Sequence, residues 1–387
     1  MIKIKIMIMM WPLFMTARKT ITTLLSRTAQ APITLGQRFV SATWRPHSRL
    51  ILVSDTASWV IDEEMRALTG VASSLGITTV SPNWRHGSRH QSVFFGSQFY
   101  LFSDEWLRSS HRIGVAYFHG LPGTGHREFD DLYNKVKHHH DRLSRVQVSH
   151  SEMRDCLLGT GISPDKLHLI PIGINRSLFH PQTPALKQDC RITYGIPQSA
   201  TVVGSFQKDG VGWDDGLEPK LIKGPDTFVA AMTALKPRVP ELFVVLSGPA
   251  RGYVKAGLEK AGIPYRHFNL PRYADIAGLY ATLDLYMITS RQEGGPKAVL
   301  ESMAAGIPLV TTRVGQAMDM VTHGKNGWIT AVDDIEALTH WAQWGLEHPA
   351  ERQHIVAAGL TTAEANDYNQ QGPLWQKFLT GFVEPDL

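Results

Sequence analysis

The chain has 387 residues, of which 43% are hydrophobic and 19% charged. This composition is typical of a soluble globular protein and excludes disordered and fibrous classes, and the length favours two domains over a single core. The formal net charge of +4 is small. It permits an anionic ligand but gives no reason to expect nucleic acid, which requires a clustered basic face.

The first 48 residues differ from the rest of the chain, because they carry basic residues and no acid precedes Asp55. The apolar run from Ile6 to Met15 is too short to span a bilayer. Three interpretations are open: a targeting or signal segment, a basic apolar patch lying on a membrane, and an irregular extension upstream of the true start. We favour an extension over residues 1–48 that makes peripheral membrane contact.

From Arg49 onward, apolar runs of strand type alternate with stretches of helical spacing. The helical stretches include Ile61–Gly76, which ends at a glycine, and Ser151–Gly159, where Ser151 is the expected N-cap. The first series of predicted strands covers Leu50–Asp55, Arg112–Gly120, Arg145–Ser151 and Lys166–Ile174.

A second series of predicted strands covers Ala200–Phe206, Leu242–Gly248, Leu283–Ser290 and Ile307–Thr312. Two runs of βα units predict an α/β protein with two Rossmann-like parallel-sheet domains facing across a cleft. We expect a first domain over residues 49–182 and a second over 198–365. A C-terminal helix within residues 366–387 is expected to return to the first domain.

The loop after the strand Leu283–Ser290 carries a candidate anion site. Gly294 and Gly295 let a ligand approach the backbone, and Pro296 suits the first position of a helix. The amides that follow, together with Lys297, would attract a phosphate. Glutamates at 293 and 301 flank this turn and could accept hydrogen bonds from hydroxyls on either side of a diphosphate. Spacing alone is equally compatible with an ordinary βα turn carrying solvated acids.

At this point the chain resembles a known family. Residues 293–329 resemble the signature of retaining GT-B glycosyltransferases of family 4, the glycosyl transferases group 1, whose E-x7-E motif falls on Glu293 and Glu301. Residues 148–181 are similar to the end of that family's N-terminal domain, and residues 202–228 to the start of its nucleotide-binding domain. The resemblance covers about the last three fifths of the chain and implies the GT-B fold.

The resemblance also implies roles for individual residues. Glu301 would bind the ribose, Glu293 the donor sugar near its reacting carbon, and Lys223 the leaving diphosphate. His119 matches a histidine that faces the donor sugar, although a hydrogen-bonded core histidine is an open alternative. Glu293, Lys223 and His119 are thus the candidate catalytic residues, and the candidate donor-binding residues are Glu301, Gly294, Gly295, Pro296, Lys297, Ala298, Ser205 and Lys208.

The chain departs from the family pattern at two places. Ser205 stands where an arginine is usual, and our hypothesis is that Lys208 supplies the missing charge. Gln316 replaces the second glycine of a usual pair, and Asp319 stands where glutamate is commoner. These changes are expected to alter the sugar pocket without abolishing the chemistry.

The segment Gly120–Arg127 has the spacing of a phosphate-binding P-loop. It lacks the lysine and the Ser/Thr that touch phosphate and magnesium in such loops, so we expect no nucleoside triphosphate hydrolysis. We interpret it as a flexible loop over the acceptor side.

The resemblance implies a retaining transfer from a nucleotide-diphosphate sugar to a glycan, lipid-linked or small-molecule acceptor, in surface polysaccharide or glycoconjugate synthesis. It implies no cofactor and no metal. The expected location is cytoplasmic or at the inner face of the membrane. Two alternatives stay open: a catalytically silent nucleotide-sugar binding protein, and an enzyme of the same fold that hydrolyses or epimerises the donor.

Overall fold

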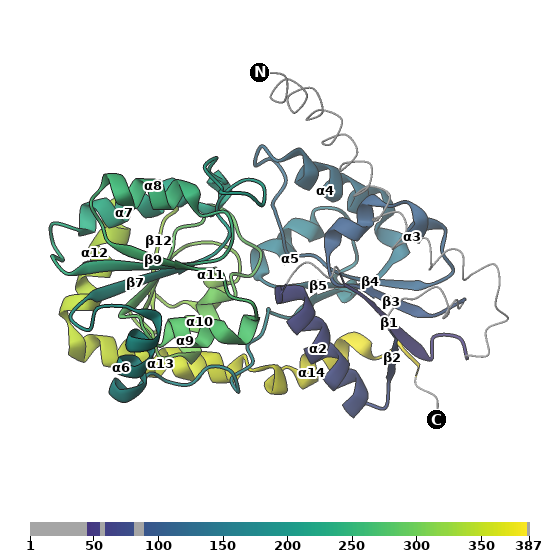
Figure 1. Ribbon diagram of the computed structural model, residues 1–387. Coiled ribbons are helices and arrows are strands. Elements are labelled where there is room, and N and C mark those ends of the chain that lie inside the picture. Colours follow the sequence, from purple (N-terminus) through teal and green to yellow (C-terminus); the bar gives the residue numbers. More distant parts are fainter. Residues whose placement is uncertain (1–44, 55–58, 81–88, 385–387) are drawn as a thin grey trace, which may run out of the picture.

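The structure is a computed structural model that describes residues 45–54, 59–80 and 89–384. Most of the expected N-terminal extension, residues 1–44, therefore lies outside the described residues. Figure 1 shows two α/β domains side by side, with the earlier part of the chain on the right and the later part on the left.

The first domain contains a six-stranded sheet in which all neighbouring strands are parallel, in the order β2-β1-β3-β4-β5-β6. Its strands are β1 (Arg49–Val53), β2 (Thr78–Val80), β3 (Ser92–Phe95), β4 (Arg112–Ala116), β5 (Leu143–Val148) and β6 (Leu167–Leu169). Its helices are α2 (Trp59–Ser74), η2 (Gln98–Phe102), α3 (Glu105–Arg108), α4 (Arg127–His139), η3 (His140–Arg142), α5 (Ser151–Leu158) and η4 (Pro164–Lys166).

The second domain contains another parallel six-stranded sheet, in the order β12-β11-β10-β7-β8-β9. Its strands are β7 (Thr201–Phe206), β8 (Leu242–Ser247), β9 (Tyr265–Phe268), β10 (Leu285–Ile288), β11 (Leu309–Thr312) and β12 (Trp328–Thr330). Its helices are α6 (Pro184–Tyr194), η5 (Leu221–Lys223), α7 (Pro225–Leu235), α8 (Gly252–Lys260), η6 (Tyr273–Asp275), α9 (Ile276–Tyr280), α10 (Ala298–Ala304), α11 (Ala317–Met320), α12 (Ile335–Glu347) and α13 (Pro349–Ala365).

Both sheets are buried on both faces. Along β1, Leu50 belongs to the core beneath α2, whereas Ile51 belongs to the core beneath α3, α4 and α5. Along β7, Val202 packs with α9 and α10, and Val203 with α7 and α8. Successive residues of a strand point to opposite faces, so such apolar runs are expected of sheets covered on both sides. The predicted pair of Rossmann-like parallel-sheet domains is confirmed.

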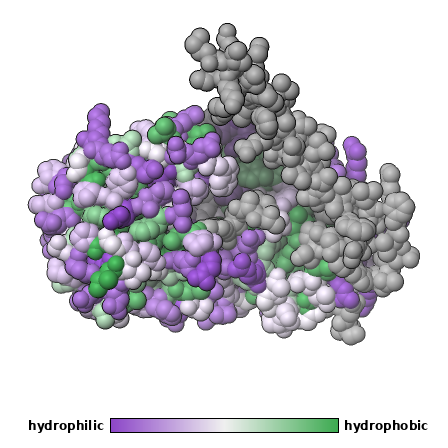
Figure 2. All heavy atoms as spheres, in the orientation of Figure 1, coloured by the Kyte–Doolittle hydropathy of each residue, from purple (hydrophilic) through white to green (hydrophobic). Residues whose placement is uncertain are grey.

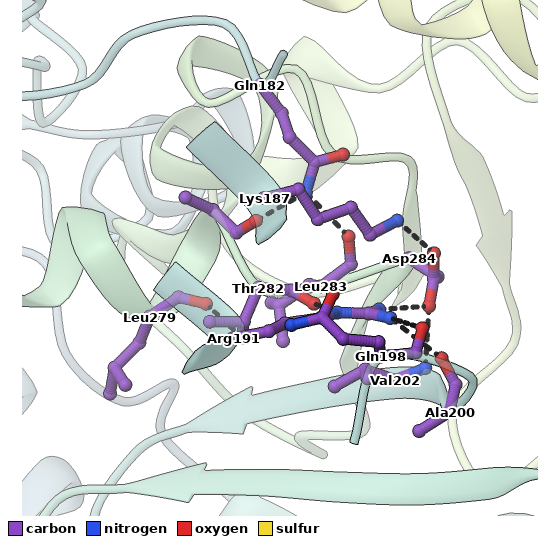
Figure 3. A network of polar contacts seen from close by, with 11 residues as sticks. Gln182, Lys187, Arg191, Gln198, Ala200, Val202, Leu279, Thr282, Leu283 and Asp284 are labelled. Carbon is purple, nitrogen blue, oxygen red and sulfur yellow. Dashed lines mark hydrogen bonds and ion pairs between the residues drawn. The ribbon is translucent and has the colours of Figure 1, made fainter. Parts of the chain in front are cut away.

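Helix α6 is fixed to the second domain by a partly buried ionic network (Figure 3). Arg191 on α6 donates to Asp284 at 2.8 Å and to the carbonyls of Thr282, Gln198 and Ala200 at 3.0 Å each. Lys187 also pairs with Asp284. Helix α6, which precedes the expected domain start at residue 198, is therefore bonded to the second domain.

The chain returns to the first domain at its C-terminus through η7 (Tyr368–Gln370) and α14 (Gly372–Leu379), which run along the lower side in Figure 1. Trp375 and Phe378 of α14 meet Phe94 of β3 edge-on, with ring centres 5.8 and 5.4 Å apart. Beyond the helix, Arg112 on β4 pairs with Glu384 at 2.7 Å. The expected returning helix is thus present and is part of the core of the first domain.

Two local predictions were wrong. The predicted strand Lys166–Ile174 ends at Leu169, because Pro171 cannot donate to a sheet and Ile174 instead bridges to Asp367 at the domain junction. The expected cap at Ser151 is also absent: His150 is the N-cap residue, without a side-chain hydrogen bond to the helix, and Ser151 is the first helical residue.

Four short strands, β2, β3, β9 and β12, were not predicted from the sequence. Each has only three or four residues, whereas the equally short β6, β10 and β11 were found because they lie within longer apolar runs of the sequence.

No helix in the described part of the chain is both long and apolar enough to cross a membrane. On the face shown in Figure 2, the second domain is largely hydrophilic, with apolar residues scattered between polar ones.

Candidate active site

Lys223 and Glu293 form an ion pair at the carboxyl end of the second sheet. Lys223 Nζ lies 2.6 Å from Glu293 Oε1, which also accepts a hydrogen bond from Ser290 Oγ at 2.9 Å. Gly224 has φ +61°, and a Cβ at this position would collide with the Thr289 carbonyl. The glycine thus lets η5 pack against the end of β10, which brings Lys223 beside Glu293.

His119 follows β4 of the first domain, and the charges of Lys223 and Glu293 both act on its pKa. Its backbone is fixed by Gln98, whose Oε1 accepts from the His119 amide at 2.7 Å and whose Nε2 donates to the His119 carbonyl. Burial first, and then Lys223, lower the pKa of His119 to about 4. The imidazole is therefore neutral near pH 7 and can both donate and accept a hydrogen bond. The structure brings the three candidate catalytic residues together across the domain boundary.

Lys220 belongs to the same charged group, and it was missed from the sequence. Burial lowers its pKa, and the neighbouring charges of Lys223 and Lys208 lower it further, whereas Glu293 opposes them. Ammonium groups that repel one another in a partly buried site favour an anion with more than one negative charge. The signal in the sequence was a second lysine three residues before Lys223.

Lys208 lies at the edge of this group. Its Nζ is 4.0 Å from the centre of the Trp213 ring, as a cation–π contact. The loop that carries both residues is ordered by backbone hydrogen bonds, including Lys220 N to Asp209 O at 2.7 Å and Val211 N to Glu218 O at 2.9 Å. Lys208 thus has an aromatic partner in the described structure, and the hypothesis that it supplies the missing charge remains a proposal.

Ser205 is only 2% exposed and interacts with a buried arginine. Arg251 Nη1 donates to the Ser205 carbonyl at 2.6 Å, and Nη2 donates to Ser205 Oγ at 3.2 Å. Arg251 Nε in turn lies 3.0 Å from Asp209, and both of these charged side chains are fully buried. The Arg251 charge is therefore matched inside the protein, so this arginine does not supply free charge at the position where the family arginine is missing.

Gly294 and Gly295 allow the first domain, rather than a ligand, to approach closely. A Cβ on Gly294 would collide with Phe118, and one on Gly295 would collide with Ile172. The Gly294 carbonyl accepts from Ser149 Oγ of the first domain at 3.0 Å. The predicted helix start at Pro296 also shifts, because α10 begins at Ala298 with Lys297 as its N-cap residue.

Glu301 and Lys297 turn toward a group of tyrosines. Glu301 is 5% exposed and accepts hydrogen bonds from the Tyr273 and Tyr280 hydroxyls at 2.6 and 2.9 Å. Lys297 Nζ lies 3.1 Å from the Tyr368 hydroxyl and 4.7 Å from the centre of the Tyr273 ring. Burial raises the pKa of Glu301 and lowers that of Lys297. No described contact joins these two side chains to the Lys223–Glu293 pair.

A cavity of about 900 Å³ lies beside this tyrosine group, between the two domains. Helix α2 contributes Arg66, the segment joining the domains contributes Asn175, and the second domain contributes Tyr273. The returning C-terminal segment contributes Tyr368. The cavity is therefore bounded by both domains and by both crossings of the chain between them.

Glu64 of α2 is buried behind Lys297. Its Oε1 accepts from the Tyr368 hydroxyl and from the Gly173 amide, whereas its Oε2 has no hydrogen bond. The Oε1 atom of Gln147, a residue that acts on the pKa of Glu64, is likewise a buried acceptor without a donor. Burial raises the pKa of Glu64 to about 7. The Lys297 charge and the hydrogen bonds from Tyr368, Gly173 and Gln147 act in the other direction and lower this pKa, so burial is the cause of the shift.

Gln316 and Asp319, which like Ser205 depart from the family pattern, hold the domains together. Gln316 Oε1 accepts from the Ile172 amide at 3.0 Å. Asp319 accepts from the Ser151 amide at 2.7 Å and from its hydroxyl at 2.6 Å. The expectation that these residues alter the sugar pocket is not tested by these contacts.

Within the described residues, no group of three or more histidine, cysteine, aspartate or glutamate side chains is arranged to hold a metal ion. Cys156 and Cys190 are both free and only partly buried.

The chain is similar in sequence to curated proteins and in fold to solved structures. The chain is 30% identical over 203 residues to the lipopolysaccharide core biosynthesis mannosyltransferase LpsB of Rhizobium meliloti (strain 1021), which covers 50% of this chain and 54% of that protein. The matched region spans about half the length of this relative and of the mannosyltransferase LpcC of Rhizobium leguminosarum bv. viciae, to which the chain is 32% identical.

Among solved structures, Anabaena Alr3699/HepE in complex with UDP and glucose matches with a TM-score of 0.68 and 17% identity, over 86% of this chain and 100% of that chain. WaaG, a glycosyltransferase involved in lipopolysaccharide biosynthesis, matches with a TM-score of 0.61 and 15% identity, over 85% and 99%. At these identities the likeness concerns the fold, which is GT-B.

Residues 217–361 match the family model described as glycosyl transferases group 1. This range includes Lys223, Glu293 and Glu301. The chain therefore carries a glycosyl transferases group 1 domain within a GT-B fold.

Proposed function

We propose that this protein is a retaining glycosyltransferase that moves a sugar from a nucleoside diphosphate sugar to a glycan acceptor. The observation that carries the proposal is the meeting of His119 from the first domain with the Lys223–Glu293 pair of the second, beside Lys220. A site shared by two domains can bind one substrate on each and exclude water when the domains close.

The difficult step in such a transfer is charge separation. The bond between the anomeric carbon and the β-phosphate oxygen breaks, and the acceptor oxygen bonds to that carbon from the same side. The acceptor proton passes to the departing phosphate oxygen. Lys223 and Lys220 stabilise the charge that develops on the diphosphate, since fixed cations in a partly buried site act strongly on a developing anion.

Glu293 and His119 act on the sugar side. Once a diphosphate engages Lys223, the Glu293 carboxylate is free to accept a hydrogen bond from the sugar and to stabilise positive charge near its anomeric carbon. His119, neutral because of its lowered pKa, hydrogen-bonds to a sugar hydroxyl without adding a charge.

The ribose of the donor binds at Glu301. In the described structure the Tyr273 hydroxyl occupies one oxygen of this carboxylate. A ribose hydroxyl takes the place of that contact, entering from the cavity that Tyr273 lines. Replacement of Tyr273 by Phe should then strengthen donor binding, whereas replacement of Glu301 by Gln should weaken it.

The names of similar proteins support a glycoconjugate product. The relative named above is a lipopolysaccharide core mannosyltransferase, and the solved neighbour HepE was crystallised with UDP and glucose. We propose a nucleotide sugar as donor and a surface glycan or glycolipid core as acceptor.

The transfer requires no metal, because lysine side chains provide the charge that a divalent ion would otherwise supply at the diphosphate. Addition of EDTA should leave the initial rate unchanged, and a loss of activity that Mg²⁺ or Mn²⁺ restores would contradict this part of the proposal.

Peripheral contact with the cytoplasmic face of a membrane is a further part of the proposal, based on the basic and apolar sequence of the first 48 residues. Flotation of the chain with anionic liposomes, with and without residues 1–45, tests it. Equal behaviour of the two forms would remove it.

A panel of UDP-, GDP- and ADP-sugars, incubated with and without core oligosaccharide released from lipopolysaccharide by mild acid, tests the proposed activity. Nucleotide release that requires the oligosaccharide supports the transferase. Release without it indicates a hydrolase, and binding without turnover indicates a silent binding protein. Glu293→Gln is the matched variant, and it should lose turnover.

A further inference from the structure

An array of aromatic rings leads outward from His119 on the first domain. The rings of Phe99 and His119 are nearly parallel, with centres 6.1 Å apart and planes 14° apart. The rings of Phe99 and Phe102 repeat this arrangement at 6.3 Å and 19°. Rings stacked with this offset do not cover one another completely, so part of each face stays available.

Both phenylalanines are accessible, although phenylalanine is usually buried. Phe99 is 39% exposed and Phe102 is 46% exposed, and both belong to the short helix η2. The ordered backbone of η2 explains why the rings hold their positions: Ser97 Oγ caps the helix through the Phe99 amide, and Gln98 ties the helix to the backbone of His119. The array is therefore a rigid surface attached to the candidate reacting centre.

The second domain contributes an aromatic ring near the same centre. Trp213 is 71% exposed, and its ring faces Lys208. The charge of Lys208 lowers the pKa of Lys220. The charge of Glu128, on α4 of the first domain, raises the pKa of Lys220. Between these loops, Gln292 Nε2 lies 3.4 Å from Thr124 Oγ1. The Trp213 ring is thus joined through Lys208 and Lys220 to the charged group around Lys223.

We propose that Phe99, Phe102 and Trp213 form the acceptor-binding surface and that they stack against the sugar rings of an oligosaccharide. This inference rests on the proposed function. The terminal sugar of the acceptor lies between His119 and Glu293, and the next sugar lies on the rings of Phe99 and Phe102. The C–H groups on one face of a pyranose carry partial positive charge and meet the electron-rich face of an aromatic ring, while its hydroxyls stay in water.

The charges around these rings favour a glycan over a lipid surface. Trp213 is followed directly by Asp214 and Asp215, and Phe102 is followed by Asp104, which pairs with Lys135 at 2.6 Å. Surfaces that bind anionic membranes surround their apolar residues with unpaired lysines and arginines. Lys208 contacts the Trp213 ring and Lys135 pairs with Asp104, so neither is an unpaired cation. The carboxylates of Asp214 and Asp215 would be repelled by an anionic bilayer, but they can accept hydrogen bonds from sugar hydroxyls.

Saturation-transfer NMR on the full chain tests this surface, with core oligosaccharide released from lipopolysaccharide by mild acid as the probe. Irradiation of aromatic protons should transfer signal to the oligosaccharide C–H protons. We expect Phe102→Ala and Trp213→Ala each to weaken oligosaccharide binding about fivefold or more. Ile192→Ala, which removes a side chain 66% exposed on α6, should leave it unchanged. Circular dichroism establishes that each variant is folded.

Several results would overturn the proposal: no oligosaccharide binding by the wild-type chain, equal binding by all three variants, or binding of phosphatidylglycerol vesicles that is lost with Phe102. Titration of UDP and GDP by calorimetry keeps the two proposals apart. A chain that binds oligosaccharide through these rings but binds no nucleoside diphosphate would contradict the proposed transferase and support the acceptor surface. A chain that binds a nucleoside diphosphate, and whose oligosaccharide binding is unchanged in the ring variants, would support the proposed transferase and contradict the acceptor surface.

Discussion

Lys223 and Glu293 are 70 positions apart in the sequence, yet their charged atoms lie 2.6 Å from each other. The contact joins the turn before α7 to the loop after β10, two segments at the same edge of a parallel sheet. In a donor complex the lysine would exchange this carboxylate for phosphate oxygens. The ion pair thus holds both side chains at the edge of the sheet where we propose that the donor binds.

Replacement of Lys223 by Ala should lower kcat/KM by about 10²- to 10³-fold, the range found when one fixed donor to a developing anion is removed. Steady-state kinetics with the donor identified by the nucleotide-sugar panel measures the loss. Lys260→Ala, at the exposed end of α8, is the matched control and should leave kcat/KM unchanged. A Lys223→Ala enzyme with the wild-type rate would contradict the assignment.

Lys220→Ala should weaken UDP or GDP binding by about 10- to 100-fold, because a charge-assisted hydrogen bond contributes about 1.5–3 kcal/mol. Lys208→Ala should have a smaller effect, since its ammonium already lies on the Trp213 ring. Calorimetry at low and high salt makes the comparison, and Lys220→Arg should retain most of the affinity. If Lys208→Ala proved the more damaging change, the hypothesis that Lys208 replaces the missing arginine would be preferred.

The stability of the chain should depend on the protonation of Glu64. Its pKa in the folded protein is about 7, against an ordinary value of 4.5. Between these pH values the folded chain holds a proton that the unfolded chain has lost, so the free energy of unfolding falls as pH rises from about 4.5 to about 7. At 1.36 kcal/mol per pH unit, this group contributes a decrease of about 3 kcal/mol.

Glu64→Gln should remove that part of the pH dependence, because an amide does not titrate in this range and its oxygen can still accept from the Tyr368 hydroxyl. Urea unfolding of both proteins at pH 5 and pH 8 measures the difference. Lys297 is the ionisable neighbour whose charge acts on Glu64, and it is present in both proteins. Parallel pH profiles for the two proteins would show that Glu64 is ionised throughout.

Asp284→Asn should destabilise the second domain by about 3 kcal/mol, because it leaves the buried guanidinium of Arg191 without its counter-charge. Differential scanning calorimetry should show a lower Tm. Asp275→Asn is the control: it breaks an ion pair to the exposed Arg272, and its Tm should equal that of the wild type. Equal melting of both variants would mean that the network around Arg191 does not contribute to stability.

The sequence located the parts of the site that follow directly from the ends of strands. Glu293 comes soon after the apolar run Leu283–Ser290, so the strand pattern placed it at the edge of its sheet, whereas His119 came from the family resemblance. Lys223 came from the family resemblance. The position of Glu293 thus needs only local sequence and the rule that parallel strands end at one edge, whereas Lys223 and His119 needed the resemblance.

The surroundings of Glu301 could not be predicted in this way. Its hydrogen-bond donors, Tyr273 and Tyr280, precede it by 28 and 21 positions, and Tyr368, which contacts Lys297, comes from the returning C-terminal segment. Such contacts depend on how η6, α9 and η7 pack around α10, and periodicity carries no information about that packing. Lys220 was missed for a related reason, since a lysine near a turn resembles an ordinary solvated residue.

The close contact of Gly294 with Phe118 has a consequence for protein engineering. GT-B halves are attractive modules for building chimeras with new donor and acceptor pairings. In this chain any side chain at 294 would act as a wedge against the end of β4, and a transplanted partner half would have to offer a backbone of the same shape at Phe118 and a hydroxyl at the position of Ser149. In a chimera designed only from the similarity of the separate halves, the two domains would not close fully at this contact. The donor and acceptor sites would then be too far apart for transfer.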